Sequence, residues 1–145
     1  MRYLLDTDHC SYIQRGHPDV VRRLQRLPLD AEVMTSVITQ AELLAGIEQA
    51  PSARRREELR TLYDQLLTRI ADVLPVPSEV AEKFAEVITS LVRKGIPVPV
   101  NDIWSAAVAL AHDLIVVSQD GHFQHVDGLR TKNWTRPSET ETTRQ

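Results

Sequence analysis

Short apolar runs alternate with longer segments of helical periodicity along the chain. Three runs of three or four residues each predict a buried strand: residues 3–5, 33–35 and 114–117, the last rich in β-branched side chains. A fourth run, residues 74–76, contains Pro75, which cannot donate a hydrogen bond to a neighbouring strand. We therefore expect it at a sheet edge or in a loop.

Between these runs, apolar side chains recur at the three- and four-residue spacing of helices. The pattern predicts helices over residues 37–44, 59–70, 80–91 and 103–110. Ser78 is expected to cap the third helix and Asn101 to open the fourth, because both side chains can accept hydrogen bonds from free N–H groups. Gly95 and Pro97 are expected to end the third helix.

This alternation of strands and helices predicts an α/β domain. Parallel β-α-β units place helices on both faces of one sheet. The chain has 145 residues, which is the length of one domain with a substantial core. Because residues 136–145 contain no apolar side chain except proline, we expect a domain over residues 1–135 and a disordered tail after it.

Composition narrows the possible functions only slightly. Hydrophobic residues make up 42% of the chain and charged residues 26%, as in globular proteins. With Cys10 as the one cysteine, neither a disulfide framework nor a cysteine-based zinc site is expected. The histidines have no ligand-like spacing beyond His122-x-x-His125, so no histidine metal site is expected. The sequence predicts neither a signal peptide nor a membrane span, and hence a cytoplasmic location.

The charge balance argues mildly against a nucleic-acid partner. The chain carries 17 basic and 20 acidic residues, a net charge of −3, whereas nucleic-acid-binding domains are usually basic. One basic cluster, residues 54–56 with Arg60, could contact RNA phosphates. Because Glu57 and Glu58 follow directly, a solvated helix face is the favoured interpretation of this cluster.

Four isolated acidic residues mark the ends of predicted strands and the helices near them. Asp6 ends the first strand and Asp120 follows the third, while Asp102 lies at a helix start and Glu42 within an apolar helix. In parallel sheets, ligands bind beyond the carboxyl ends of the strands, so Asp6 and Asp120 are expected in one crevice. Each acid alone could serve a turn or a cap. Together, four carboxylates would repel one another unless a divalent cation, Mg²⁺ or Mn²⁺, neutralised them.

The segments that carry these acids resemble the ordered motifs of PIN-domain nucleases. The matching segments are residues 4–8 (LLDTD), 36–43 (SVITQAEL), 101–107 (NDIWSAA) and 116–123 (VVSQDGHF). The resemblance extends to about Trp134 and is strongest toward VapC, the toxin of VapBC toxin–antitoxin modules. It rests on the order and spacing of the motifs, since none of them is specific alone.

The resemblance implies a fold, an activity and a set of site residues. The fold is an α/β/α sandwich with a central parallel sheet, and the activity is that of a Mg²⁺- or Mn²⁺-dependent endoribonuclease. The implied catalytic residues are Asp6, Glu42, Asp102 and Asp120, with Asp6, Asp102 and Asp120 as metal ligands and Asp8, Ser36 and Ser118 as supporting residues. Many relatives carry an acid where this chain has His122, which leaves the number of metal ions open.

The resemblance also implies partners for the chain. These are an RNA substrate, a cognate VapB-type antitoxin and a second copy in a homodimer, with no membrane involved. The amphipathic helices over residues 59–70 and 80–91 either supply apolar grooves for the antitoxin or bury all their apolar area in the core. The sequence leaves both arrangements open.

Two other functions remain open from the residues alone. The Asp6-x-Asp8 pair at a strand end is similar to the nucleophile motif of haloacid-dehalogenase-type phosphatases, although the later lysine and paired acids of that family are not evident. A non-catalytic interaction domain would use the same acids as turns and caps. An assay with a phosphatase substrate distinguishes the first alternative, and a metal titration distinguishes the second.

Overall fold

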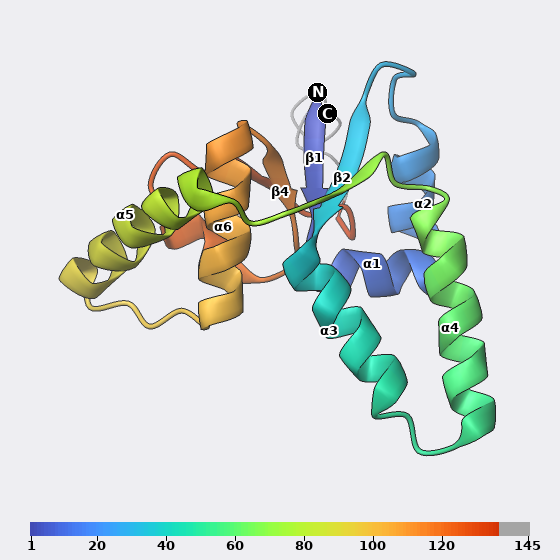
Figure 1. The fold of residues 1–145 in the computed structure, drawn as a ribbon. Helices are drawn as coiled ribbons and strands as arrows, with labels where there is room; N and C mark the ends of the chain where they lie inside the picture. Colours follow the sequence, from blue (N-terminus) through green and yellow to red (C-terminus); the bar gives the residue numbers. More distant parts are fainter. Residues whose placement is uncertain (137–145) are drawn as a thin grey trace.

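A five-stranded sheet lies at the centre of residues 1–136, the part of the chain that this computed structural model describes (Figure 1). The strands are β1 (Arg2–Leu5), β2 (Glu32–Ser36), β3 (Asp72–Leu74), β4 (Ile115–Val117) and β5 (Thr131–Lys132). Their order is β3-β2-β1-β4-β5, and all neighbours run parallel. The predicted disordered tail lies outside the described residues, apart from Arg136.

Helices cover both faces of this sheet (Figure 1). They are α1 (Thr7–Gln14), α2 (Pro18–Gln25), α3 (Val37–Glu48), α4 (Ala53–Leu67), α5 (Ser78–Lys94) and α6 (Val100–His112), followed by a short 3₁₀ helix, η1 (Gly121–His125). In Figure 1, α5 and α6 lie together on one side of the sheet, and α3 and α4 form a hairpin that extends away from it. The predicted α/β/α sandwich is confirmed.

Alternate residues of the strands contribute to two separate cores. In β1, Leu4 lies in the core shared with α5 and α6, whereas Tyr3 and Leu5 lie in the core shared with α1, α2 and α4. Trp134 is fully buried in the second core, where its ring packs edge-on against Tyr3. Burial on both faces explains why the strand segments are almost continuously apolar.

The predicted starts of two helices are wrong in detail. The N-cap of α5 is Pro77 rather than Ser78, and the N-cap of α6 is Pro99 rather than Asn101. In both helices the proline carbonyl accepts a hydrogen bond from a backbone N–H of the first turn. Proline is tolerated there because its missing N–H would have no helical partner in any case. Ser78 and Asn101 therefore lie inside the first turn.

The end of α5 is as predicted, whereas β3 and α4 are shifted from the expected residues. Gly95 ends α5 with φ at 71°, a left-handed conformation that glycine adopts without strain, as predicted. The strand predicted near Pro75 is β3, which lies at the sheet edge. The helix predicted over residues 59–70 begins earlier, behind the Ser52 cap, and ends at Leu67. None of the helices within residues 1–136 is long and apolar enough to cross a bilayer.

Candidate active site

The carboxyl ends of the adjacent strands β2, β1 and β4 define the site. Asp6 directly follows β1, and Ser118 directly follows β4. The backbone N–H of Asp6 donates to the Val117 carbonyl at 3.0 Å, which continues the pairing of β1 with β4 past the strand end. This pairing holds Asp6 beside Ser118, although 112 positions separate them in the sequence.

Ser118 connects the predicted acidic residues. Its Oγ lies 2.9 Å from Oδ2 of Asp6 and 3.2 Å from Oδ2 of Asp8, and it accepts the backbone N–H of Asp120 at 3.0 Å. A serine hydroxyl has a single proton, so it can donate to only one of the two carboxylates at a time. Ser118 therefore binds Asp6 and Asp8 as alternative acceptors and holds the start of the Asp120 loop.

A second cluster lies beside the first and consists of Asp102, Asp120 and His122. One ligand atom from each of the three lies within 4.8 Å of the others. His122 Nδ1 is 3.1 Å from Oδ2 of Asp102 and 2.7 Å from Oδ1 of Asp120. Asp120 is also the N-cap of η1, where Oδ1 accepts the backbone N–H of His122. All three side chains remain partly exposed, so solvent reaches the cluster.

Burial and mutual repulsion shift the pKa values of these acids. Burial, followed by the negative charge of Asp8, raises the pKa of Asp6 to about 7, and Asp102 adds to the shift. Burial and neighbouring Asp120 raise the pKa of Asp102. The hydrogen bond to Asp102 raises the pKa of the His122 imidazole. Both carboxyl groups are thus destabilised in their charged forms by their surroundings.

These residues fit a divalent cation. Carboxylate oxygens and an imidazole nitrogen are ligands that divalent metals use in proteins. A cation would also neutralise the repulsion that raises the pKa values of Asp6 and Asp102. Spacing along the sequence gave no signal for His122, because its partner Asp102 lies 20 residues earlier on another element. The structure thus brings His122 to the acidic cluster, and the prediction that no histidine binds a metal stays a prediction.

Glu42 reaches the site through a contact that the sequence did not indicate. It lies in the middle of α3, which begins at Val37, so a capping role for this carboxylate is excluded. Thr7, the residue after Asp6, donates its hydroxyl to Oε1 of Glu42 at 2.8 Å. The Glu42 carboxylate is therefore held at an exposed position against Thr7, the residue that follows the buried Asp6.

Ser36 does not contact the acidic residues directly. It is buried at the end of β2 and caps α3, where its Oγ accepts the backbone N–H of Thr39 at 3.5 Å. Within residues 1–136, no hydrogen bond joins its hydroxyl to a carboxylate. Any support from Ser36 therefore acts through the orientation of α3, which carries Glu42.

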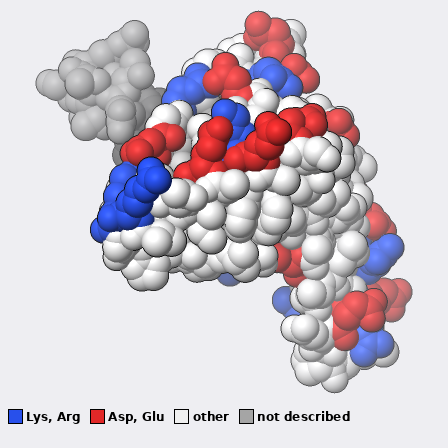
Figure 2. Space-filling view, turned by 60° about the vertical axis from the view of Figure 1, so that its left-hand side comes forward, with Lys and Arg blue, Asp and Glu red and all other residues white. Residues whose placement is uncertain are grey.

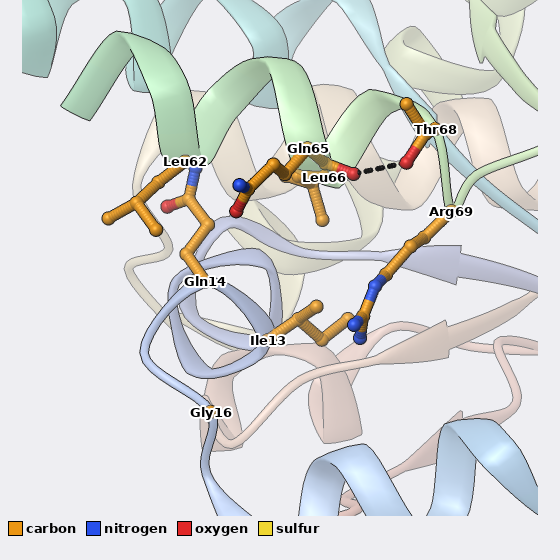
Figure 3. Close-up of a pocket in the computed structure, with 8 residues that line it drawn as sticks. All are labelled: Ile13, Gln14, Gly16, Leu62, Gln65, Leu66, Thr68 and Arg69. Atoms are coloured by element: carbon orange, nitrogen blue, oxygen red, sulfur yellow. Dashed lines mark hydrogen bonds between the residues drawn. The ribbon is translucent and has the colours of Figure 1, made fainter. Parts of the chain in front are cut away.

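A groove of about 490 Å³ lies between α1 and α4, away from the acids (Figure 3). Figure 3 shows Ile13 on one wall, with Leu62 and Leu66 on the other and the Arg69 side chain reaching across the end. The helix predicted over residues 59–70 therefore does line a partly apolar groove. The corresponding residues of α5 pack instead into the core shared with α6.

Comparisons with known proteins identify the family to which the chain belongs. The model of the PIN domain family matches residues 3–129. Ribonuclease VapC1 of Haemophilus influenzae is 30% identical over 139 residues, which cover 94% of this chain and 100% of that protein. The tRNA(fMet)-specific endonuclease VapC of Shigella flexneri is 29% identical over 137 residues, which cover 93% of this chain and 99% of that protein.

A solved structure extends the likeness to the fold. A chain of VapBC2 from Rickettsia felis, solved bound to a DNA fragment from its promoter, superposes on this chain with a TM-score of 0.84 at 26% sequence identity. The match covers 92% of this chain and 99% of the chain compared. The family model, the sequence relatives and the fold thus agree, and the chain belongs to the PIN domain family, among its VapC-type members.

Proposed function

We propose that this chain is the toxin of a VapBC-type toxin–antitoxin pair, a metal-dependent endoribonuclease that acts in the cytoplasm. The observation that carries the proposal is the meeting of Asp6, Asp102 and Asp120 around Ser118 and His122 at the carboxyl ends of β1 and β4. Membership of the PIN domain family supports it. The direct test is cleavage of purified RNA by the purified chain with Mg²⁺ or Mn²⁺, alone and with its cognate VapB-type antitoxin.

The contacts of Asp6 and Asp8 argue against the two alternative functions, although Asp120 does cap η1. Asp6 occupies the N-cap position of α1 but makes no side-chain cap bond, so this acid is not explained as a cap. A phosphatase of the haloacid-dehalogenase type would need the second carboxylate free to act on its substrate. Asp8 is instead engaged by His9, the backbone of Gln119 and Ser118.

We propose that Asp6, Asp102 and Asp120 bind the cation, with His122 as an additional ligand. Bound there, a divalent cation supplies Lewis-acid stabilisation of the phosphodiester charge and lowers the pKa of the attacking water. An imidazole nitrogen among carboxylate oxygens favours Mn²⁺ over Mg²⁺, because Mg²⁺ prefers an all-oxygen shell. For Glu42, whose carboxylate accepts the Thr7 hydroxyl, we propose the role of orienting the water.

Added Mn²⁺ is expected to raise the melting temperature of the metal-free chain by several degrees, and Mg²⁺ by less. A ligand at 100 times its dissociation constant stabilises the folded state by about 2.7 kcal/mol. His122→Ala should reduce the Mn²⁺ shift, whereas His125→Ala, a change at an exposed histidine of the same η1 helix, should not. Thermal unfolding measured by circular dichroism checks this, and identical shifts in all three proteins would contradict a ligand role for His122.

A metal-assisted attack by water does not use the ribose 2′-hydroxyl. The products should therefore carry a 5′-phosphate and a 3′-hydroxyl. An RNA oligonucleotide with a single 2′-deoxyribose at the cleavage position should be cut at a rate within about threefold of the all-ribose RNA, since less than about 1 kcal/mol of barrier is involved. Mass spectrometry of the fragments tests both expectations. A 2′,3′-cyclic phosphate among the products would exclude the mechanism.

Transfer RNA is the substrate class that we propose to test first. The related VapC of Shigella flexneri is named as a tRNA(fMet)-specific endonuclease. The net charge of −3 does not oppose an RNA substrate, because the four proposed catalytic acids contribute −4 to it. The arginine cluster at residues 54–56 contributes less than its charge suggests, since Arg54 and Arg55 both pair with Glu58 on α4.

We propose that the groove between α1 and α4 receives a segment of the antitoxin. Ile13 and the partly exposed Leu62 line its walls, and Arg69 supplies a positive charge at one end (Figure 3). An amphipathic segment of the partner with an acidic residue near its end would match this lining. Neutralisation by the antitoxin is supported by relatives solved as VapBC complexes, such as the Rickettsia felis pair.

We propose that the predicted homodimer forms through the face of α5 and α6. On the side formed by α5 and α6, a row of charged side chains borders a broad area with few charges (Figure 2). Val92 of α5 and Val100 of α6 are 72% and 56% exposed, unusually high values for large apolar side chains. Light scattering during gel filtration gives the mass that decides between monomer and dimer.

A further inference from the structure

His9 is a buried histidine that uses both of its ring nitrogens. It lies in α1 and has no exposed surface. Nδ1 is 2.8 Å from Oδ1 of Asp8, and Nε2 is 3.0 Å from the backbone nitrogen of Trp134, which lies 125 residues later. The side chain therefore joins the start of α1 to the last part of the described chain.

These contacts define the protonation state of the ring. A backbone N–H can only donate, so Nε2 must carry a lone pair and accept the hydrogen bond from Trp134. The remaining proton of a neutral imidazole then resides on Nδ1, which donates to Asp8. His9 is thus a neutral ring of defined tautomer with each nitrogen satisfied.

Asp8, the acceptor of that proton, holds the loop that carries Asp120. Its Oδ2 accepts the backbone N–H of Gln119 at 2.8 Å and lies 3.2 Å from Oγ of Ser118. Asp8 therefore has hydrogen-bond donors on both carboxylate oxygens, His9 on Oδ1 and the Gln119 backbone with Ser118 on Oδ2.

Asp8 must keep this position against repulsion from Asp6. Both carboxylates lie against the same Ser118 oxygen, which has a single proton for the two of them. Whenever Ser118 donates to Asp6, Asp8 depends on His9 and on the Gln119 backbone. Without the His9 proton, Oδ1 of Asp8 would have no hydrogen-bond donor within residues 1–136, and the carboxylate could rotate away from the loop.

We propose that His9 is a positioning residue that fixes the Asp8 carboxylate and, through it, the loop that carries Ser118 and Asp120 relative to Asp6. It acts without touching RNA or metal, in the way that outer hydrogen bonds orient metal ligands. The functional part of this inference rests on the proposed nuclease activity. The alternative is that His9 only packs in the core, where its ring lies edge-on to Tyr12 and Trp134.

Two variants separate these roles, because each keeps one of the two hydrogen bonds. The amide of asparagine occupies the place of Nδ1, so His9→Asn retains a donor to Asp8 and removes the acceptor for Trp134. The longer glutamine places its amide oxygen where Nε2 lies, so His9→Gln retains the acceptor and removes the donor to Asp8. Both variants lose one buried hydrogen bond and should lower the melting temperature similarly.

The turnover of the two variants should nevertheless differ. We expect kcat of His9→Gln to fall about 10–100-fold, with KM for the RNA within about twofold, and kcat of His9→Asn to stay within about threefold of the unmodified chain. Equal kcat values for the two variants, measured below both melting temperatures, would overturn the proposal. Calorimetric Mn²⁺ affinity should follow the same order, about tenfold weaker in His9→Gln only.

Two of these measurements do not depend on RNA cleavage. If the chain binds Mn²⁺ and the variants differ as expected but no RNA is cut, the proposed function fails while the positioning role stands. Nitrogen-15 shifts of the unmodified chain identify which imidazole nitrogen carries the proton and need no variant. A proton on Nε2 of His9 would overturn the proposal by itself.

Discussion

Asp6→Asn is expected to abolish RNA cleavage and, at the same time, to stabilise the metal-free protein. Asn keeps the size of the side chain and an oxygen that can accept from Ser118 Oγ, now 2.9 Å from Oδ2. It removes the charge that would bind the cation, so we expect turnover to fall by at least about 10³-fold. Catalytic sites often lower the stability of the fold in this way.

The expected stabilisation depends on pH in a defined direction. Asp6 has a pKa of about 7 in the folded protein against an ordinary value of 3.8, because burial and then Asp8 disfavour its charge. The folded state therefore binds more protons than the unfolded chain between pH 4 and 7, and stability falls as the pH rises through this range. Above pH 7 the folded protein bears the full free-energy cost of the ionised Asp6, and below pH 4 it bears none of it.

The stability of the Asp6→Asn protein should therefore exceed that of its parent only as the pH rises. We expect about 2 kcal/mol at pH 8, or roughly 4–8 °C in melting temperature, because asparagine bears its own desolvation cost. Melting curves in EDTA at pH 5 and pH 8 check this. Asp64→Asn, a change at an exposed carboxylate of α4, is the matched control and should affect neither activity nor stability. An Asp6→Asn protein less stable than its parent at pH 8 would contradict the argument.

The sequence predicts those parts of the fold in which local pattern and tertiary role agree. Strands β1, β2 and β4 are buried on both faces, so their apolar runs are uninterrupted and easily recognised. β5 has two exposed residues and exists only through its pairing with β4, so no local pattern marks it. α2 is amphipathic, with Val20, Val21 and Leu24 on one face, but it is only eight residues long, so this short pattern does not by itself predict a helix.

The residues of the site likewise fall into those that the sequence pattern predicts and those that depend on tertiary packing. Asp6 and Asp120 follow strands that the pattern reveals, and the rule that ligands bind at strand ends brings them together without knowledge of side chains. The contacts of Thr7 with Glu42 and of His9 with Trp134 join residues 35 and 125 positions apart. Such pairs depend on how the helices pack on the sheet, which no spacing rule contains.

Trp134→Ala is expected to cost about 3–5 kcal/mol of the free energy of unfolding, the range for deleting a large buried aromatic side chain. The indole is fully buried in the core of α1, α2 and α4, with its ring centre 5.4 Å from that of Tyr3 and 6.1 Å from that of His9. The cavity left by the alanine would adjoin both β1 and the start of α1. We therefore expect a fall in melting temperature of roughly 10–15 °C.

A control substitution and two truncated chains test whether Trp134 completes the folded domain. Trp104→Ala removes the same indole from a partly buried position against Phe84, so its cost should be clearly smaller. A chain ending at Arg136 keeps Trp134 and should melt at the same temperature as the full chain, as expected for a domain that closes near residue 135. A chain ending at Leu129 lacks β5 and Trp134 and should not fold, because the second core then remains open at β1. If the Leu129 chain melted like the full chain, Trp134 would not be the residue that closes the fold.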